Sequence, residues 1–314
     1  YIESLREGER INEIYLCKVK QSALTKAGKP YDTLILQDKT GTLDAKIWEP
    51  GSVGIDEFDS LDYIAVMGDI TSFQGNLQLN VKRVRKVQEG EYDPKDYLPV
   101  SDKDIDQMYE ELKGLIASIK EVHLKKLLES FFVEDADFEK RFKFHSAAKT
   151  VHHGFVGGLL EHSLSVAKHC DYFAGCYPIL NRDLLITAAI FHDIGKLEEL
   201  STFPENDYTD DGQLLGHIII GTEMVGDRIR TIPDFPKGLA SELKHCILAH
   251  HGELEFGSPK KPALPEALAL SFADNIDAKM ETVREIFNNV PENNQEWQGY
   301  NRLLESNIRR SGKL

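Results

Sequence analysis

Histidine and aspartate recur through the second half of this chain in an order that could hold metal ions. Of the 11 histidines, only His123 lies apart from a group that runs from His145 to His251. The candidate ligands are His162, the pair His192-Asp193, His217, the pair His250-His251, and Asp274. Imidazole and carboxylate ligands suit Mn, Fe, Co, Ni or Zn. The pattern therefore predicts a divalent-metal site, against the alternative of a helical protein with incidental histidines.

The chemistry that such a site supports is the hydrolysis of a phosphate ester. The two oxygens of Asp193 can bridge a pair of ions, and ions roughly 3.5–4 Å apart can activate water and stabilise the leaving oxygen. Lys196 follows Asp193 by three residues, which puts both on the same side of a helix. Its ammonium group could hold a phosphate oxygen. A purely structural site usually closes its coordination shell, whereas this set leaves room for water.

Helices are expected to position these ligands, because the apolar residues after Asp102 recur at spacings of three and four. The predicted helices cover 108–119, 122–132, 158–176, 183–199, 216–230, 238–250 and 265–287. His162 falls inside the third of them and Asp274 inside the last. No strand is predicted after residue 100.

The remaining ligands are expected at helix boundaries. His217 opens a predicted helix, and the pair His250-His251 ends one. His192 and Asp193 are adjacent, so their side chains project about 100° apart on a helix. They can bind together only if that helix ends against the metal, and Gly195 is expected to terminate it.

Residues 1–90 are expected to form a separate small barrel. Five strands are predicted, at 14–20, 31–37, 42–48, 63–68 and 77–82. Turn signals at 38–41 and 74–76 follow the second and the fourth strand. Five short strands at this spacing suit a barrel of the OB type. The acidic, proline-broken stretch 91–101 is the predicted linker, and residues 102–314 are the predicted helical domain.

The predicted barrel has side chains suited to single-stranded nucleic acid. Such barrels stack bases on aromatic side chains beside a basic groove. The candidate stacking residues are Tyr31, Trp48 and Phe73, and the candidate backbone contacts are Lys82, Lys18, Lys20, Lys46, Arg83 and Arg85. Trp48 is open to a second interpretation, as a core residue. The basic run that begins at Lys82 is likewise open to interpretation as a solvated strand edge. As a unit, the barrel is expected to bind nucleic acid.

The composition and the net charge argue against several classes of protein. The net charge of −15 argues against broad electrostatic binding to duplex nucleic acid, although residues 1–90 carry 12 basic and 14 acidic side chains. No apolar run is long enough for a membrane span, and no signal-peptide pattern opens the chain. The 4 cysteines match no zinc motif, which favours reduced thiols in a cytoplasmic protein. A homo-oligomer stays open, since the apolar run 218–220 suits a core or an interface.

The ordered ligand set resembles the HD-domain metal-dependent phosphohydrolase superfamily. The residues that carry the resemblance are His162, His192, Asp193 and Asp274, and the additional His217, His250 and His251 resemble the subset that binds two metals. The strings HHGFVGGLLEHS at 152–163 and FHDIGK at 191–196 are closer still. With the barrel in front, residues 11–290 resemble the YhaM-type 3′-to-5′ exoribonucleases of Gram-positive bacteria, also described as CMP-binding-factor proteins.

This resemblance implies roles for single residues. The first metal would be held by His162, His192, Asp193 and Asp274, and the second by His217, His250 and His251, with Asp193 as the bridge. Lys196 would contact the scissile phosphate. His153 would bind substrate or support the site, and it is equally open to a structural role as a helix cap or core residue. Asp277, one helical turn after Asp274, is expected to support the ligands or form a salt bridge.

The implied activity is a metal-dependent 3′-to-5′ exonuclease on single-stranded RNA, with single-stranded DNA as a further candidate substrate. Two divalent ions per chain, with Mn²⁺ foremost, and 5′-mononucleotide products follow from the resemblance. A nucleotide or cyclic-dinucleotide phosphohydrolase is one alternative, but it has no evident use for the barrel. The Gly-Tyr-Pro signature of the cyclic-dinucleotide branch is also absent after His250-His251. A non-enzymatic single-strand-binding protein with a structural metal is the other alternative, and Lys196 counts against it.

Overall fold

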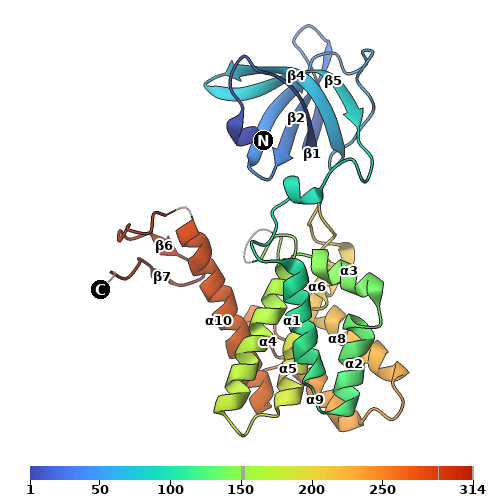
Figure 1. Ribbon diagram of the computed structural model, residues 1–314, viewed down its shortest axis with the longest axis vertical. Helices are drawn as coiled ribbons and strands as arrows, with labels where there is room; N and C mark the ends of the chain where they lie inside the picture. The colour runs from blue at the N-terminus through green and yellow to red at the C-terminus, as the bar shows by residue number, and fades with distance from the viewer. Residues whose placement is uncertain (150–152, 289, 313–314) are drawn as a thin grey trace. The chain divides into compact units, whose positions relative to one another are not determined.

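The computed structural model describes residues 1–149, 153–288 and 290–312. His152, the first residue of one of the two sequence strings above, lies outside them. The chain divides into two compact units, Tyr1–Val100 and Ser101–Leu314 (Figure 1). The first unit is built of strands, and the second is built mainly of helices.

Five strands close into a barrel in the first unit, as the sequence predicts. They are β1 (Arg10–Leu24), β2 (Pro30–Asp38), β3 (Gly41–Ile47), β4 (Tyr63–Phe73) and β5 (Asn76–Lys86). Their order is β1-β2-β3-β5-β4, with β3 and β5 parallel and the other neighbours antiparallel. Successive side chains of a strand point to opposite faces. Leu34 and Leu36 of β2 and Ile64 and Val66 of β4 therefore share the buried interior.

A bulge at Lys82 of β5 shifts the register against β4. The register between β4 and β5 shifts between Met67 and Gly68. A Cβ on Gly68 would lie 2.3 Å from the carbonyl oxygen of Asn80, so no residue with a side chain fits there. Bulges of this kind increase local twist and are common in barrels.

The segment after the last barrel strand packs against the barrel. The ring of Tyr92 stacks on Tyr63 at a centroid distance of 3.8 Å, and Tyr97 meets Tyr63 edge-on at 5.3 Å. Gln37 donates a side-chain hydrogen bond to the carbonyl of Tyr97, and the short 3-10 turn η2 (Pro94–Asp96) lies within this segment. A first turn, η1 (Ile2–Ser4), precedes the strands.

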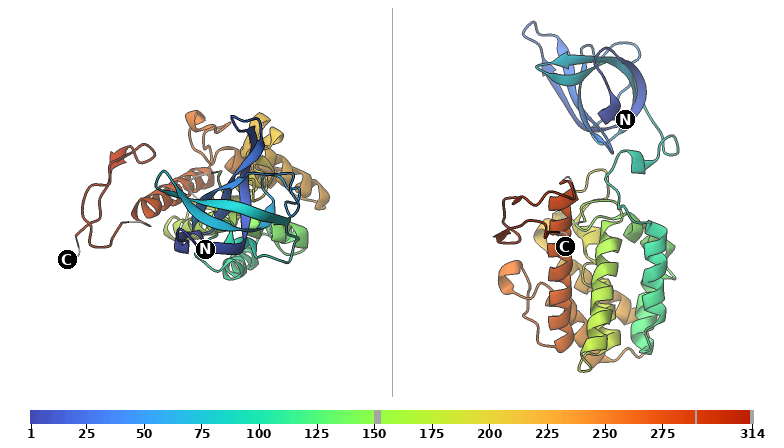
Figure 2. Two further views of the ribbon diagram at one scale, coloured as in Figure 1. Left: turned by 90° about the horizontal axis from the view of Figure 1, so that it is seen from above. Right: turned by 60° about the vertical axis from the view of Figure 1, so that its left-hand side comes forward.

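The second unit is a bundle of helices with a short C-terminal hairpin. The elements are α1 (Ile105–Ala117), α2 (Val122–Phe132), α3 (Ala136–Phe144), α4 (Gly158–Cys176), α5 (Arg182–Phe191), α6 (Lys196–Glu199), α7 (Asp210–Leu214), α8 (Gly216–Thr231), α9 (Lys237–Leu248), η3 (Leu254–Phe256), α10 (Pro265–Asn288), β6 (Tyr300–Asn301) and β7 (Ser306–Asn307). The helices α1, α4 and α10 lie side by side (Figure 2). Every residue of α5 from Leu184 to Phe191 is buried, as expected for a helix that is apolar on all sides.

Side-chain caps fix where several of these helices begin. The caps are Asp104 before α1, Glu121 before α2, Asp135 before α3, Asn181 before α5 and Thr209 before α7, and each accepts a hydrogen bond from a backbone N–H in the first turn. An N-cap of this kind stabilises a helix by about 0.5–2 kcal/mol. The cap at Asp135 shows why α3 forms, although the sequence analysis predicted no helix there.

Further features of the second unit also differ from the sequence prediction. The predicted helix 183–199 is interrupted: α5 ends at Phe191, and α6 begins at Lys196. Gly195 does not terminate a helix in a left-handed conformation, because its φ is −65° and it precedes the first residue of α6. The strands β6 and β7 were not expected, since a pair of two-residue strands leaves no periodicity to detect.

Other sequence expectations concern the membrane, the thiols and the apolar run 218–220. Among the described residues, no helix combines the length and the apolar character needed to cross a membrane. All four cysteines are free thiols, and Cys176 is the exposed one. Ile218 and Ile220 are buried, so most of that run belongs to the core of this unit.

Candidate metal centre

The helical unit brings all seven predicted ligands into one place. His162 lies on the second turn of α4, and Asp274 lies on α10. His192 and Asp193 follow directly after the last residue of α5, so the helix does end at the site. The remaining three are His217 in the first turn of α8 and the pair His250-His251 just after α9.

Four ligand atoms form the first group. The Nε2 atom of His162 lies 3.1 Å from His192 Nε2, 3.3 Å from Asp193 Oδ2 and 3.2 Å from Asp274 Oδ1. His192 Nε2 lies 3.4 Å from the same oxygen of Asp193. Ligands bound at about 2.0–2.2 Å to one ion stand roughly 3.0–3.6 Å apart. The group therefore has the dimensions of a coordination shell.

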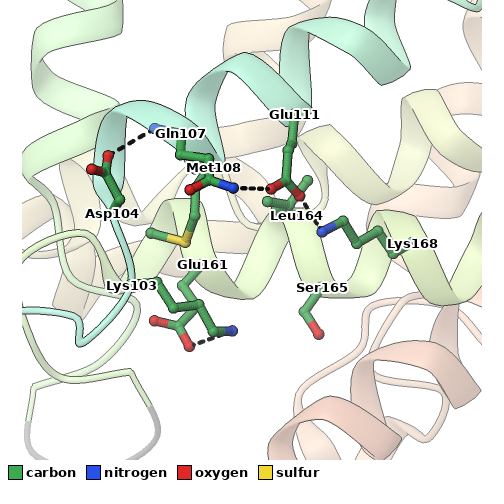
Figure 3. Close-up of a pocket in the computed structure, with 9 residues that line it drawn as sticks. All are labelled: Lys103, Asp104, Gln107, Met108, Glu111, Glu161, Leu164, Ser165 and Lys168. Atoms are coloured by element: carbon green, nitrogen blue, oxygen red, sulfur yellow. Dashed lines mark hydrogen bonds and ion pairs between the residues drawn. The ribbon is translucent and has the colours of Figure 1, made fainter.

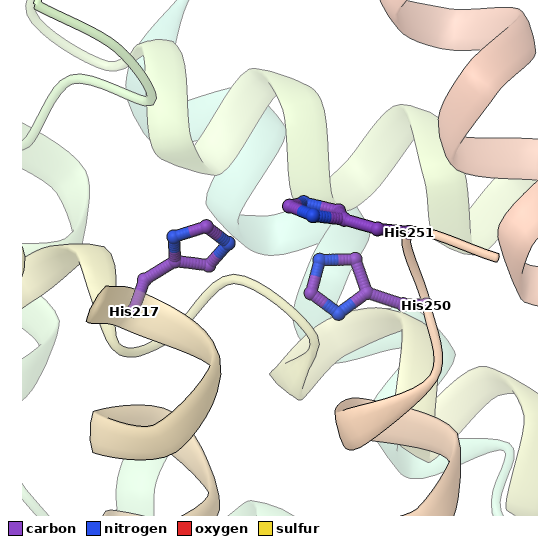
Figure 4. A group of neighbouring side chains, drawn as sticks. All are labelled: His217, His250 and His251. Atoms are coloured by element: carbon purple, nitrogen blue, oxygen red, sulfur yellow. The ribbon is translucent and has the colours of Figure 1, made fainter. Parts of the chain in front are cut away.

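The second group lies on the other side of Asp193. The Oδ1 atom of Asp193 is 3.4 Å from His217 Nε2 and 3.7 Å from His250 Nε2. His217, His250 and His251 also place one ligand nitrogen each within 4.8 Å of the others (Figure 4). The two oxygens of Asp193 thus face different groups, which is the arrangement that a bridging carboxylate requires.

Three buried atoms at the centre lack any hydrogen-bond partner among the described residues. They are Asp193 Oδ1, His217 Nε2 and His250 Nε2. A buried polar atom without a partner costs about 1–3 kcal/mol. A divalent cation between these atoms would give all three a partner at once. The donor set of imidazole nitrogens and carboxylate oxygens is also the one such cations bind, so these residues fit a metal site.

The outer nitrogen of four histidines is held in place. His162 Nδ1 lies 2.7 Å from Asp277 Oδ2, and His217 Nδ1 lies 2.9 Å from Glu199 Oε1. The Nδ1 atoms of His192 and His250 each lie 2.7 Å from a backbone carbonyl, that of Ala189 and of Ile247 respectively. Such partners keep the proton on Nδ1 and turn the Nε2 lone pair toward a metal.

At Asp193 and His250 electrostatics favour the protonation state that a metal needs, whereas at His162 burial is outweighed by Asp193, Asp274 and Asp277, which raise the pKa of the imidazole. Burial opposes the charge of Asp193, but Lys196 and the nearby imidazoles outweigh it and hold the pKa of Asp193 well below its usual range. Burial and the neighbouring His192 and His251 lower the pKa of His250 far below its ordinary value. Asp193 is therefore a carboxylate and His250 a neutral imidazole at neutral pH.

A cavity of about 440 Å³ opens beside the cluster. His162, His250, Lys196 and Asp274 all line it. The ammonium of Lys196 lies 2.6 Å from Asp193 Oδ2. Burial opposes the charge of Lys196, but Asp193 outweighs it and raises the lysine pKa, so the side chain is cationic. The cavity volume lies in the range of about 300–1,000 Å³ that small-ligand sites occupy.

His153 supports the ligand cluster through its contact with Asp277. It is buried, and its Nε2 atom lies 3.1 Å from Asp277 Oδ2, the same oxygen that holds His162. Ser165 also donates to Asp277. His153 lines the cavity as well, so its role in binding substrate stays a prediction beside this supporting contact.

A buried acid next to His162 was missed by the sequence analysis. Glu161 accepts a hydrogen bond from Ser101 at 2.5 Å and forms ion pairs with Lys103 at 2.9 Å and Arg284 at 3.2 Å. The sequence signal is an acid between the apolar residues Leu160 and Leu164, next to a candidate ligand. Glu199, which holds His217, gave no signal, because the contact depends on how α6 and α8 pack.

A second cavity, of about 330 Å³, lies between α1 and α4 (Figure 3). Its charged side chains are paired with one another: Lys103 with Glu161 and Lys168 with Glu111. The Asp104 side chain accepts from the backbone of Gln107 as the cap of α1. Among the described residues no histidine lines this cavity, so the metal chemistry belongs to the other one.

The predicted stacking residues of the barrel have different surroundings. Trp48 is 50% exposed and stacks on Tyr31 with ring centroids 5.5 Å apart, so its interpretation as a core residue is wrong. Lys46 lies 5.2 Å from the Tyr31 ring centroid. Phe73 is 60% exposed at the end of β4. Lys82 forms an ion pair with Asp69, which compensates its charge.

Replacing Gly195 by alanine is expected to disrupt the second ligand group. A Cβ there would lie 2.0 Å from the carbonyl oxygen of His217 and 2.6 Å from the backbone nitrogen of Gly221, so α8 must move away. Overpacking of this kind costs about 1–3 kcal/mol in free energy of unfolding. We expect a lower Tm and a loss of bound metal, measured by thermal melting and elemental analysis.

Gly114→Ala is the matched control for that variant. Gly114 lies in α1, and a Cβ there would meet nothing within 4 Å. Alanine is favoured over glycine in a helix by about 1 kcal/mol, so this variant should be as stable as the parent or more stable. Equal Tm values and equal metal contents in the two variants would contradict the close approach of α8.

Comparison with known proteins adds independent findings. The family model of the HD domain matches residues 159–279, a range that contains all seven candidate ligands. A protein named 3′-5′ exoribonuclease YhaM from Geobacillus sp. (strain WCH70) is 34% identical over 281 residues, which cover 88% of this chain and 84% of that protein. The protein of the same name from Bacillus subtilis (strain 168) is 35% identical over 275 residues, covering 87% and 86%.

Among solved structures, the second OB-fold domain of replication protein A from Methanococcus maripaludis matches 29% of this chain and 97% of that chain. The sequence identity is 20% and the TM-score is 0.23, which is too low to support a conclusion.

The relatives named above are 34% and 35% identical to this sequence over alignments that cover 84–88% of either chain. The HD-domain match contains the entire ligand cluster. The chain therefore belongs to the YhaM family of 3′-5′ exoribonucleases.

Proposed function

We propose that this chain is a metal-dependent exoribonuclease that shortens single-stranded RNA from its 3′ end and releases 5′-mononucleotides. The observation that carries the proposal is the position of Asp193, whose two oxygens face two separate groups of histidines beside a cavity. A two-metal site of this kind is suited to phosphodiester hydrolysis. The names of the relatives supply the polarity and the substrate class.

The ligand set supports two divalent ions per chain. His162, His192, Asp193 and Asp274 would hold one, and His217, His250, His251 and the other oxygen of Asp193 would hold the second. Bound there, the ions would polarise the scissile phosphate and make a nearby water more acidic. Mn²⁺ is the proposed metal, while Fe, Co, Ni or Zn suit the same ligands.

The chain's own side chains position the substrate for this reaction. Lys196 is a cation at the cavity wall, and it can hold a scissile phosphate oxygen while it stays close to Asp193. His153 can contact substrate from the same wall. The partly exposed pair Tyr31 and Trp48, with Lys46 beside it, is the proposed base-stacking surface of the barrel. The four free thiols fit the reducing cytoplasm.

The test is digestion of RNA that carries a label at its 5′ end, in the presence of Mn²⁺. A 3′-to-5′ exonuclease gives a ladder of shortening labelled products, and the released nucleotides carry a 5′-phosphate. Immediate release of a labelled mononucleotide would show the opposite polarity. Cleavage of free nucleotides or cyclic dinucleotides with intact RNA would favour the phosphohydrolase alternative. Single-stranded DNA of the same sequence, run in parallel, decides whether the sugar matters.

Removal of the Trp48 ring is expected to weaken strand binding. Stacking on an aromatic side chain contributes about 1–3 kcal/mol per base, so Trp48→Ala should raise the Kd for single-stranded RNA about tenfold. The measurement is fluorescence anisotropy with labelled RNA, in an Asp193→Asn background that prevents digestion.

The control for that variant is Tyr172→Ala, which removes an exposed aromatic ring from the helical unit. It should leave the Kd unchanged. Cleavage of a small phosphodiester such as bis(p-nitrophenyl) phosphate should be the same in Trp48→Ala and the parent, because this compound needs no barrel. An unchanged Kd for Trp48→Ala would show that the stacked pair does not bind the strand.

A further inference from the structure

The wall of the active-site cavity extends well past the metal ligands. Beyond Asp274, α10 lines the cavity with Asn275, Ala278, Lys279 and Thr282. Ala278 and Thr282 follow Asp274 at the helical spacings of four and eight, and Asn275 and Lys279 lie further round the helix, so the lining leads away from the cluster along and around α10. Leu303, from the turn between β6 and β7, also lines the cavity.

Lys279 is the cation of this surface that is free to bind an anion. Lys196, the other lysine of the cavity, already pairs with Asp193. Lys279 is exposed, and among the residues that the structure describes it forms no ion pair. The chain as a whole carries a net charge of −15. An unpaired cation in this cavity is therefore a favourable place for a phosphate to bind.

The position of Lys279 on α10 suits the phosphate next to the scissile one. Lys279 follows Asp274 by five residues, which corresponds to about 7–8 Å along the helix axis. Lys279 is also turned about 140° round the helix from Asp274, and its flexible four-carbon stem lets the ammonium reach along the cavity that both residues line. A strand whose scissile phosphate lies at the cluster can therefore reach Lys279 with its next phosphate.

The surface between the two positions suits a nucleoside. Ala278 and Leu303 offer apolar contact from two different elements, and Leu303 is 54% exposed. Asn275, also exposed, carries both a donor and an acceptor for the polar edge of a base or sugar.

We propose that this face of α10, together with Leu303, is the subsite for the nucleotide on the 5′ side of the scissile bond. Leu303 packs against the nucleoside, and Lys279 binds the phosphate that precedes it. The subsite rests on the proposed function and adds the path by which the strand leaves the cluster. It also assigns a role to the C-terminal hairpin, which supplies one wall of the cavity.

The experiment compares two short substrates that differ by one phosphate. A dinucleoside monophosphate contains only the scissile phosphate, whereas a trinucleoside diphosphate also contains the phosphate assigned to Lys279. In Lys279→Ala we expect KM for the trinucleotide to rise about five- to tenfold with kcat unchanged. The salt dependence of log KM should fall by roughly 0.7, the value for one phosphate contact of a single strand. KM for the dinucleotide should not change.

Two further variants complete the test. Lys279→Arg keeps the charge and should restore most of the trinucleotide KM, whereas Leu303→Ala should raise KM for both compounds. Lys237→Ala, which removes an exposed lysine from the first turn of α9 and away from the cavity lining, should affect neither.

Two outcomes would count against the subsite. Equal effects of Lys279→Ala on both compounds would show that the lysine does not read the second phosphate, and no effect on either would show that the strand takes another path. A parent protein that cleaves neither compound would contradict the proposed function itself, and the subsite would fall with it.

Discussion

Replacement of Asp193 by asparagine is expected to reduce kcat on RNA by about 10²–10³-fold, the scale seen when a charge-stabilising group is removed from an active site. The Oδ2 atom of Asp193 faces the first histidine group, and its Oδ1 atom faces the second. The amide keeps the size of the side chain but removes the negative charge that the cluster and Lys196 share. The measurement is single-turnover digestion of labelled RNA, together with elemental analysis of bound metal.

The matched control for this variant is Asp171→Asn. Asp171 forms a surface ion pair with Arg182 at 2.6 Å. It lies on α4 more than two helical turns after His162, the candidate ligand on that helix. It should keep full activity and full metal content. Circular dichroism of both variants shows whether the helical unit is intact. A folded Asp193→Asn protein with near-normal kcat would contradict the role of Asp193 as the bridging ligand.

Removal of metal is expected to lower both activity and stability. Chelation leaves three buried atoms of the centre without a partner, Asp193 Oδ1, His217 Nε2 and His250 Nε2. A ligand at 100 times its Kd stabilises the folded state by about 2.7 kcal/mol per site. For a unit of this size, each kcal/mol corresponds to roughly 2–4 °C in Tm. We therefore expect chelation to lower Tm by about 5–10 °C per site and to reduce cleavage to background.

Two comparisons make that result specific. Addition of Mn²⁺ in excess over the chelator should restore both Tm and cleavage in the parent protein. In Asp193→Asn the same addition should shift Tm much less, because both sites have lost a charged ligand. A parent protein whose Tm and activity do not respond to chelation would contradict a resident metal.

The candidate site could be predicted from the sequence because its polar residues lie where the local pattern calls for apolar ones. His162 lies in a helix that is otherwise largely apolar and buried, and His192 and Asp193 follow a helix that is buried on all sides. Polar side chains in such places need a partner, and a metal is one that several of them can share. The barrel was predictable for a related reason, since strand alternation and turn residues are local signals.

The parts that the sequence could not show depend on contacts between distant elements. Gly195 resembles a helix terminator, and only the approach of the His217 carbonyl explains why no side chain fits there. Glu199 holds His217 because α6 packs on α8. Lys82 pairs with Asp69 across β4 and β5, in a register set by the bulge at Lys82 itself. None of these contacts leaves a periodic trace in the chain.

The most direct test of the two-metal centre is a crystal structure of the protein grown with Mn²⁺, with anomalous scattering measured above the Mn absorption edge. The account predicts two anomalous peaks, one on each side of the Asp193 carboxylate. One peak should lie among His162, His192 and Asp274, and the other among His217, His250 and His251. A single peak away from Asp193, or no peak at saturating Mn²⁺, would contradict the central claim.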